Sequence, residues 1–185
     1  MIDDILNEAK SKMKDAVDAY EKDLTGMRSN RASIALVDRL MVEYYGQDTE
    51  LRQLANISTP EALQILIRPY DASAVQAIEK AIQQSDIGVH PSVDGQSIWL
   101  NMPPLTRERR QELVKVLKKR TETAKISVRN ARRSANDDLK EFEREKMISE
   151  DDQKYGEEEV QRLTDNYIDK IEELEKDKEQ DILEV

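Results

Sequence analysis

Apolar positions in the first part of the chain recur every three or four residues, which is the spacing of one face of an α-helix. Polar and charged residues fill the positions between them. The pattern predicts a long amphipathic helix that ends shortly before Asn30. The apolar positions of this face are Ile2, Ile5, Leu6, Ala9, Met13, Ala16, Val17, Tyr20, Leu24 and Met27.

Between residues 31 and 104 the helical spacing is replaced by short apolar runs separated by turn signals. Runs at 40–45, 51–58 and 63–67 are typical of β-strands. Asp71 is placed to cap a helix that ends before Gly88, and the Asp94-Gly95 pair predicts a hairpin turn ahead of a last strand at 97–100. We therefore expect residues 31–104 to form a small inserted β/α/β domain.

Helical spacing returns after Pro103 and Pro104, and Thr106 is a suitable N-cap for the new helix. The apolar stripe from Leu113 to Phe142 predicts a helix of about 40 residues, roughly 60 Å long. A break at residues 148–149 and an acidic first turn precede a third stripe that begins at Val160. The predicted fold class is α+β, with residues 1–30 and 105–185 forming an elongated antiparallel three-helix bundle that carries the inserted domain.

Two covalent connections join the predicted bundle to the predicted insert, near residues 29–31 and 102–105. Asn30 lies in the first connection, and Pro103 and Pro104 lie in the second. Two parallel connections of this kind can act as a hinge. We therefore expect the inserted domain to move against the bundle about these residues.

The formal charge of −10 over 185 residues is distributed unevenly along the chain. Residues 107–133 hold eleven Lys and Arg against three Glu, whereas residues 150–185 hold 15 Asp and Glu against five Lys and Arg. Phosphate binding is driven by clustered Lys and Arg, so the net charge alone does not exclude a nucleic-acid partner. One predicted helix can bind phosphate while another repels it.

Several classes of protein are disfavoured by the composition. The chain has no cysteine, an acidic start and no apolar run long enough for a membrane span, so we expect a soluble, cytoplasmic protein without disulfides, thiolate metal sites or membrane contact. Aromatic residues make up 4%, which is poor for a deep apolar pocket. His90 is the only histidine and lies in no recognisable catalytic motif. We expect no catalytic residue, metal, cofactor or small-molecule substrate.

The cations of the long predicted helix fall on an arc of their own beside its apolar face, at about 100° per residue. A solvated charged face is the ordinary explanation of such a stripe. Its single sign in an acidic chain instead favours contacts with RNA phosphate, for which the planar guanidinium fork is well suited. The residues of this basic stripe are Lys115, Lys118, Lys125, Arg129, Arg132 and Arg133.

Three further features have more than one interpretation. Arg28 and Arg31 bracket the end of the first helix, where they either extend the basic surface or complement the helix C-terminal dipole. Trp99 lies in the last predicted strand, where packing is the more common role of a tryptophan. Acidic pairs in the last helix resemble a solvated face more than an acid/base pair or a Ca²⁺ loop.

An ordered set of short motifs spans most of the chain. The motifs are Arg31-Ala32-Ser33, Val42-Glu43-Tyr44-Tyr45-Gly46, Leu51-Arg52-Gln53-Leu54-Ala55, Pro103-Pro104-Leu105-Thr106 with Glu108-Arg109-Arg110, Val128-Arg129-Asn130 with Arg132-Arg133 and Ala135-Asn136-Asp137, and Ile148-Ser149-Glu150-Asp151. In this order and at these separations, the set resembles the bacterial-type ribosome recycling factor family. Ser29-Asn30 stands where the family usually has Thr-Gly, and Trp99 and Asn101 stand where Arg and Pro are frequent.

The resemblance implies a cytoplasmic translation factor with two arms and a shape like transfer RNA. Such a factor binds the post-termination ribosome, mainly through large-subunit ribosomal RNA. With elongation factor G and GTP hydrolysis, it splits the ribosome into subunits and releases it from mRNA. Carried over by position, Arg129 and Arg132 are the main expected RNA contacts, Arg28, Arg31 and Arg133 support them, and Lys118 and Lys125 complete the predicted ribosomal-RNA-binding set.

The alternative function is a helical coiled-coil interaction module or a chaperone-like protein. It accounts for the apolar stripes and the acidic end of the chain, but not for the inserted domain or the localised positive charge. A nucleotide enzyme is a more distant alternative, since the chain has no phosphate-cradling Gly-rich loop. We expect a monomer, because the three stripes can be buried within one bundle.

Overall fold

The computed structural model describes residues 1–184, which form two compact units. The first unit comprises Met1–Leu24 and Val114–Gln180. The second comprises Thr25–Leu113 and the described residues from Asp181 onward. The predicted α+β fold class, with long helices and a small β-containing part, is confirmed.

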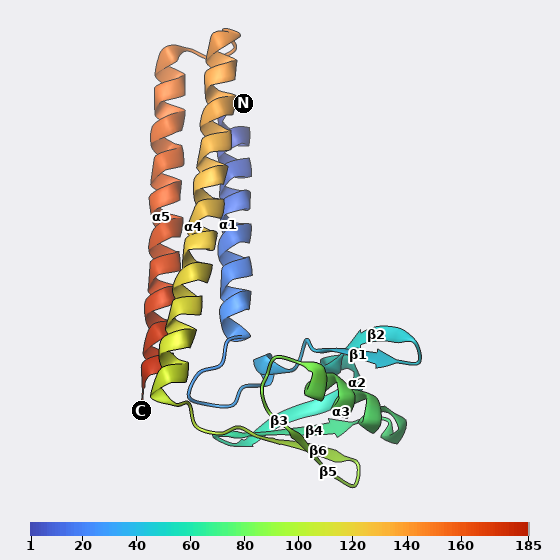
Figure 1. Ribbon diagram of the computed structural model, residues 1–185. Coiled ribbons are helices and arrows are strands. Elements are labelled where there is room, and N and C mark those ends of the chain that lie inside the picture. The colour runs from blue at the N-terminus through green and yellow to red at the C-terminus, as the bar shows by residue number, and fades with distance from the viewer. Residues whose placement is uncertain (185) are drawn as a thin grey trace. The chain divides into compact units, whose positions relative to one another are not determined.

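Three helices provide the first unit. They are α1 (Ile2–Thr25), α4 (Arg107–Arg144) and α5 (Glu150–Leu183). The last residue of α1, the first residues of α4 and the last residues of α5 are grouped with the second unit. The helices α1 and α5 run in one direction and α4 runs in the other, so α4 is antiparallel to both neighbours (Figure 1). At 38 residues, α4 is close to the length expected from its apolar stripe. No helix in residues 1–184 is both long enough and apolar enough to cross a membrane.

Capping explains where the two long helices begin. The hydroxyl of Thr106 accepts a hydrogen bond from the amide of Arg109 at 3.1 Å, as expected for the cap of α4. At the start of α5, Ser149 and Asp152 form a reciprocal capping box in which each side chain accepts from the other's amide at 3.1 Å. The bonds from Ser149 hold the pKa of the Asp152 carboxyl below its ordinary value.

The helices bury the apolar faces that the sequence predicts. Met13, Leu117, Leu139, Val160 and Ile171 are completely buried. Gly156 of α5 is also buried, and a Cβ placed on it would lie 2.7 Å and 2.9 Å from the two terminal methyl groups of Leu139. The glycine therefore allows α5 to approach α4 closely at this level.

One buried polar contact connects α1 to α4. The hydroxyl oxygens of Tyr20 and Thr121 are 2.6 Å apart, and the Thr121 hydroxyl donates to the carbonyl of Leu117 at 2.9 Å. A threonine hydroxyl has one proton. Because that proton is used on Leu117, Tyr20 must donate to Thr121. Burial raises the pKa of the Tyr20 phenol.

We expect Thr121→Val to destabilise the bundle by about 1–3 kcal/mol, because it leaves the buried Tyr20 hydroxyl without its acceptor. Tyr20→Phe should cost only about 1 kcal/mol, since Thr121 keeps its bond to the helix backbone. Urea denaturation of both single variants and of the double variant measures the difference. A double variant no more stable than Thr121→Val would contradict this explanation.

The second unit contains six strands in two antiparallel sheets. β1 (Met41–Tyr44) pairs only with β2 (Gln47–Glu50). The other sheet has the order β3-β4-β6-β5. Its strands are β3 (Ala55–Glu61), β4 (Gln64–Pro69), β5 (Pro91–Asp94) and β6 (Ser97–Asn101). The helices α2 (Leu51–Leu54) and α3 (Val75–Gln84) and the 3-10 turns Ile34–Leu36 and Ala72–Ala74 complete the unit.

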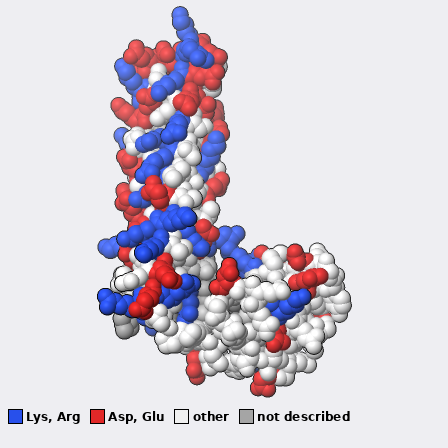
Figure 2. Space-filling view, viewed as in Figure 1, with Lys and Arg blue, Asp and Glu red and all other residues white. Residues whose placement is uncertain are grey.

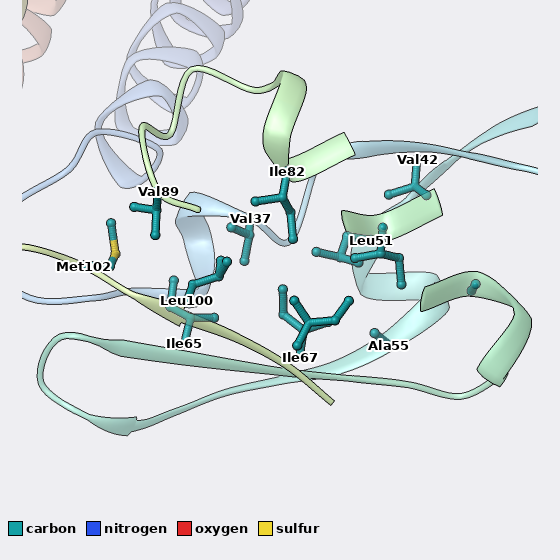
Figure 3. Close-up of a cluster of buried hydrophobic side chains, with 13 residues drawn as sticks. Val37, Val42, Leu51, Ala55, Ile65, Ile67, Ile82, Val89, Leu100 and Met102 are labelled. Carbon is teal, nitrogen blue, oxygen red and sulfur yellow. The ribbon is translucent and has the colours of Figure 1, made fainter. Parts of the chain in front are cut away.

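The core of the second unit lies between its four-stranded sheet and the elements that cover one face of that sheet (Figure 3). Ile65 and Ile67 of β4 are completely buried, as are Ile98 and Leu100 of β6. Trp99, between the last two, lies on the opposite face, directly across from Leu66 in the register. Leu66 is only 5% exposed, so this second face is also partly covered.

The predictions for the insert are partly wrong. The expected strand at 51–58 is divided, since Leu51–Leu54 is a helical turn and only residues from Ala55 belong to a strand. Leu51 and Leu54 are three residues apart, so one helical turn directs both toward the core, where Leu51 is completely buried. The Asp94-Gly95 hairpin is confirmed, with Gly95 at a φ of +60°.

Candidate nucleic-acid interface

Three cations of the predicted basic stripe lie in one row along α4, seven residues apart, and face α5. Lys118 is 3.9 Å from Glu179, and Lys125 is 2.7 Å from Glu172. Each step of seven residues up α4 is thus matched by seven residues back along α5, as the antiparallel helices require. The side chain of Lys125 is only 17% exposed. The charge of Lys125 is therefore offset by a close carboxylate, whereas the exposed Lys118 is only loosely paired.

Arg132 occupies the next position of this row, but its partner carries no charge. Its Nη1 donates to the side-chain carbonyl oxygen of Gln161 at 3.2 Å. The amide nitrogen of Gln161 in turn donates to Oδ1 of Asp165 at 2.8 Å. Counting seven residues from Glu172 leads to Asp165, so the acidic residue expected opposite Arg132 is bonded to Gln161 instead. Arg132 keeps its positive charge on a partly exposed surface.

Two other predicted contacts flank Arg132 on the same helix. Arg129 is 44% exposed and forms an ion pair at 2.9 Å with Glu122, which lies on α4 itself. An exposed pair of this type contributes little to stability and is readily exchanged for another anion. Arg133 is exposed and makes no ion pair or hydrogen bond within residues 1–184. Arg120, on another side of α4, donates to the carbonyl of Asp23 on α1 at 3.2 Å.

Arg28 and Arg31 belong to the second unit. Arg28 is partly buried, and its guanidinium donates to the backbone carbonyl of Pro103. Burial, and to a lesser extent the neighbouring charge of Arg109, lowers the pKa of Arg28. Arg31 is exposed. Arg28 therefore makes a specific contact between the two connecting segments, and this contact, rather than an interaction with the helix dipole, accounts for its position.

The predicted hinge residues lie outside regular helices and strands. Asn30 is partly buried, whereas Pro103 and Pro104 are exposed. The bond from Arg28 to Pro103 links the first connecting segment to the second. The structure shows one conformation of the two connections, and movement about them remains a prediction.

The two units differ in surface charge. On the visible face of the helical unit, Lys and Arg alternate with Asp and Glu, whereas the visible face of the second unit is mostly uncharged (Figure 2). Residues 31–104 contain nine Asp and Glu against five Lys and Arg. The positive charge suited to phosphate is therefore concentrated on α4.

A groove of about 460 Å³ between α1 and α4 is lined mainly by small side chains, including Ala16, Ala19 and Ala124. Within residues 1–184, no group of three or more His, Cys, Asp or Glu side chains is arranged to hold a metal ion. His90 is exposed and immediately precedes β5.

The sequence interpretation missed Gln161 and Asp165, because the last helix was treated as a solvated acidic face. A usable signal was present. The cations 118, 125 and 132 and the acids 179, 172 and 165 both recur every seven residues, which is the pattern of two facing antiparallel helices. Only the packing of α4 against α5 places Gln161 between Arg132 and Asp165.

A three-helix bundle with a small inserted β-containing unit defines a class of translation factors, as solved structures of similar proteins show. A solution structure of the ribosome recycling factor has a TM-score of 0.80 and 46% identity, covering 100% of this chain and 98% of that one. A T. thermophilus ribosome recycling factor, described with E. coli elongation factor G on the E. coli post-termination complex, has a TM-score of 0.68 and 39% identity, with 99% of each chain covered.

Sequence comparisons agree with the structural ones. The family model described as "Ribosome recycling factor" matches residues 20–183. The ribosome-recycling factor of Bacillus licheniformis is 50% identical over 181 residues, with 98% of both chains covered. Those of Bacillus subtilis and Chloroflexus aurantiacus are 49% and 50% identical over 185 residues, with both chains fully covered in each case. The chain belongs to the ribosome recycling factor family.

Proposed function

We propose that this protein binds the post-termination ribosome and, with elongation factor G and GTP hydrolysis, promotes its separation into subunits and its release from mRNA. The observation that carries this proposal is the full-length similarity to ribosome recycling factors, of which one is described on a post-termination complex together with elongation factor G. The protein acts as a cytoplasmic, monomeric binding factor and catalyses no covalent step itself.

The finer part of the proposal concerns the binding face. Large-subunit ribosomal RNA contacts α4, with Arg132 and Arg129 as the main phosphate ligands and Arg133 beside them. Arg132 suits this role because its hydrogen-bond partner Gln161 is neutral, and Arg129 because its ion pair with Glu122 is exposed. Lys118 and Lys125 add charge to the same face but share it with α5. Arg28 and Arg31, at the first connection between the two domains, support this binding.

Movement between the units accompanies binding in this proposal. Residues 31–104 form the moving domain, and residues 1–30 and 105–185 form the ribosome-binding bundle. The rotation takes place about Asn30 and about Pro103 and Pro104. The proposal is supported by the irregular backbone of all three residues and by the two covalent connections in which they lie.

A recycling assay on purified post-termination complexes tests the function. With elongation factor G and GTP, the protein should convert 70S particles to subunits, and omission of either should abolish the conversion. The protein should also sediment with 50S or 70S particles at low salt and leave them as the salt concentration rises. Self-association without ribosome binding would instead support the coiled-coil module.

A further inference from the structure

The row of contacts between α4 and α5 changes in chemical character along its length. At Lys118 and Lys125 the group contributed by α5 is a carboxylate, whereas at Arg132 it is the amide of Gln161. A carboxylate both orients a cation and cancels its charge. An amide oxygen is uncharged and can orient the cation without cancelling its charge.

The orientation of the Gln161 amide is itself fixed. A carboxylate is an acceptor only, so Asp165 must face the NH₂ group of Gln161, which turns the carbonyl oxygen toward Arg132. The Asp165 carboxylate is thus used to orient an amide rather than to neutralise the arginine.

The remaining donors of Arg132 are available to a ligand. A guanidinium has five N–H groups in a planar fork, and within residues 1–184 only Nη1 of Arg132 is engaged. Asn136, one turn further along the same side of α4, presents a buried Oδ1 that has no partner in the described chain. At Arg132, α5 therefore contributes one uncharged amide, that of Gln161, where the preceding pattern would place a carboxylate.

We propose that Gln161, held by Asp165, is a positioning residue that orients the charged guanidinium of Arg132 for ribosomal RNA phosphate. The inference rests on the proposed ribosome-binding function. Because the side chain is ordered before binding, less conformational entropy is lost when the phosphate is bound. Gln161 itself touches no RNA in this proposal.

Two substitutions at Gln161 have different expected effects on ribosome binding. Gln161→Ala removes the hydrogen bond that orients Arg132 but leaves the guanidinium charged. Ribosome affinity should therefore fall about 2- to 10-fold, which is the cost of ordering one long side chain on binding. The dependence of affinity on salt should not change. Gln161→Glu makes this position resemble those of the two lysines. Affinity should then fall by more than tenfold, and the slope of log affinity against log salt should decrease by about one phosphate contact.

Gln153 provides a matched control on the same helix. It donates to Glu157 at 3.0 Å, which reproduces the spacing and chemistry of the Gln161–Asp165 bond, but within residues 1–184 its side chain makes no hydrogen bond to a cation of α4. Gln153→Ala and Gln153→Glu should change ribosome affinity by less than about twofold, the range expected for surface changes remote from the contact. If any added negative charge on α5 weakened binding, Gln153→Glu would lower ribosome affinity as much as Gln161→Glu does.

Two readouts separate positioning from folding and from the proposed function. The NMR signals of the Arg132 guanidinium should show faster side-chain motion in Gln161→Ala than in the parent, at an unchanged melting temperature. In an Arg132→Ala background, Gln161→Ala should have no further effect on affinity. If Arg132→Ala weakens binding but both Gln161 variants bind like the parent, the positioning role is wrong. If Arg132→Ala itself binds like the parent, the RNA-binding assignment fails instead.

Discussion

Arg132→Ala is expected to weaken ribosome binding by about 1–3 kcal/mol, the cost of removing a charge-assisted hydrogen bond. The folding stability should change by only about 0.5 kcal/mol or less, because the side chain is partly exposed and bonded to a surface glutamine. The dependence of log affinity on log salt should also become shallower by about one phosphate contact. Binding to 50S subunits over a series of salt concentrations measures both quantities.

Three further alanine variants make the Arg132 result specific. Arg133→Ala should weaken binding less, because the Arg133 side chain lies farther round α4 from the apolar face than the Arg132 side chain does. Lys125→Ala should also do less, because its ammonium group already contacts Glu172. Lys176→Ala, on the acidic helix α5, should have almost no effect. An Arg132→Ala protein with the parent's affinity and salt dependence would show that the basic stripe is only a solvated face.

Leu139→Ala is expected to destabilise the bundle by about 2–5 kcal/mol, since Leu139 is completely buried and the change leaves a cavity. Its contact with Gly156 makes a second variant informative. In the parent, Gly156→Ala brings a methyl group to within 2.7 Å of Leu139. Overpacking of about 1–3 kcal/mol should then exceed the gain of about 1 kcal/mol in helix propensity.

The double variant determines which effect dominates. Once Leu139 is alanine, the added methyl group of Gly156→Ala has space, so the same substitution should stabilise the protein by about 1 kcal/mol. Denaturant unfolding of the parent, both single variants and the double variant completes the cycle. A Gly156→Ala effect of the same sign in both backgrounds would show that close helix approach does not explain the glycine.

The helical part of the fold could be predicted from sequence because its information is local. Each long helix combines a continuous apolar stripe with a recognisable start, such as Thr106 for α4 and the Ser149–Asp152 box for α5. The insert was harder, since the segment beginning at Leu51 has apolar residues that fit one helical turn as well as a strand. Only contacts with the rest of the unit select the helix.

The candidate site was predictable only in part. The helix periodicity placed Arg129, Arg132 and Arg133 near one another on α4, and it also grouped Lys118 and Lys125 with them. It could not indicate which of these cations a neighbouring helix neutralises, because that depends on the alignment of α4 against α5. The contrast between Glu172 facing Lys125 and Gln161 facing Arg132 is a tertiary property.

The strand β2 has a consequence for the behaviour of the protein in solution. Its sequence, Gln47-Asp48-Thr49-Glu50, contains no apolar residue, and for that reason the strand was not predicted. It forms because Tyr45 and Gly46 adopt positive φ values of 50° and 75°, which turn the chain back onto β1. Within the described residues β2 pairs on one side only, so its other edge is open. Open edges invite pairing with other chains, and two carboxylates on four residues repel a second copy of the same strand. The polar and acidic composition that makes β2 difficult to predict from the sequence also protects the protein against edge-to-edge aggregation.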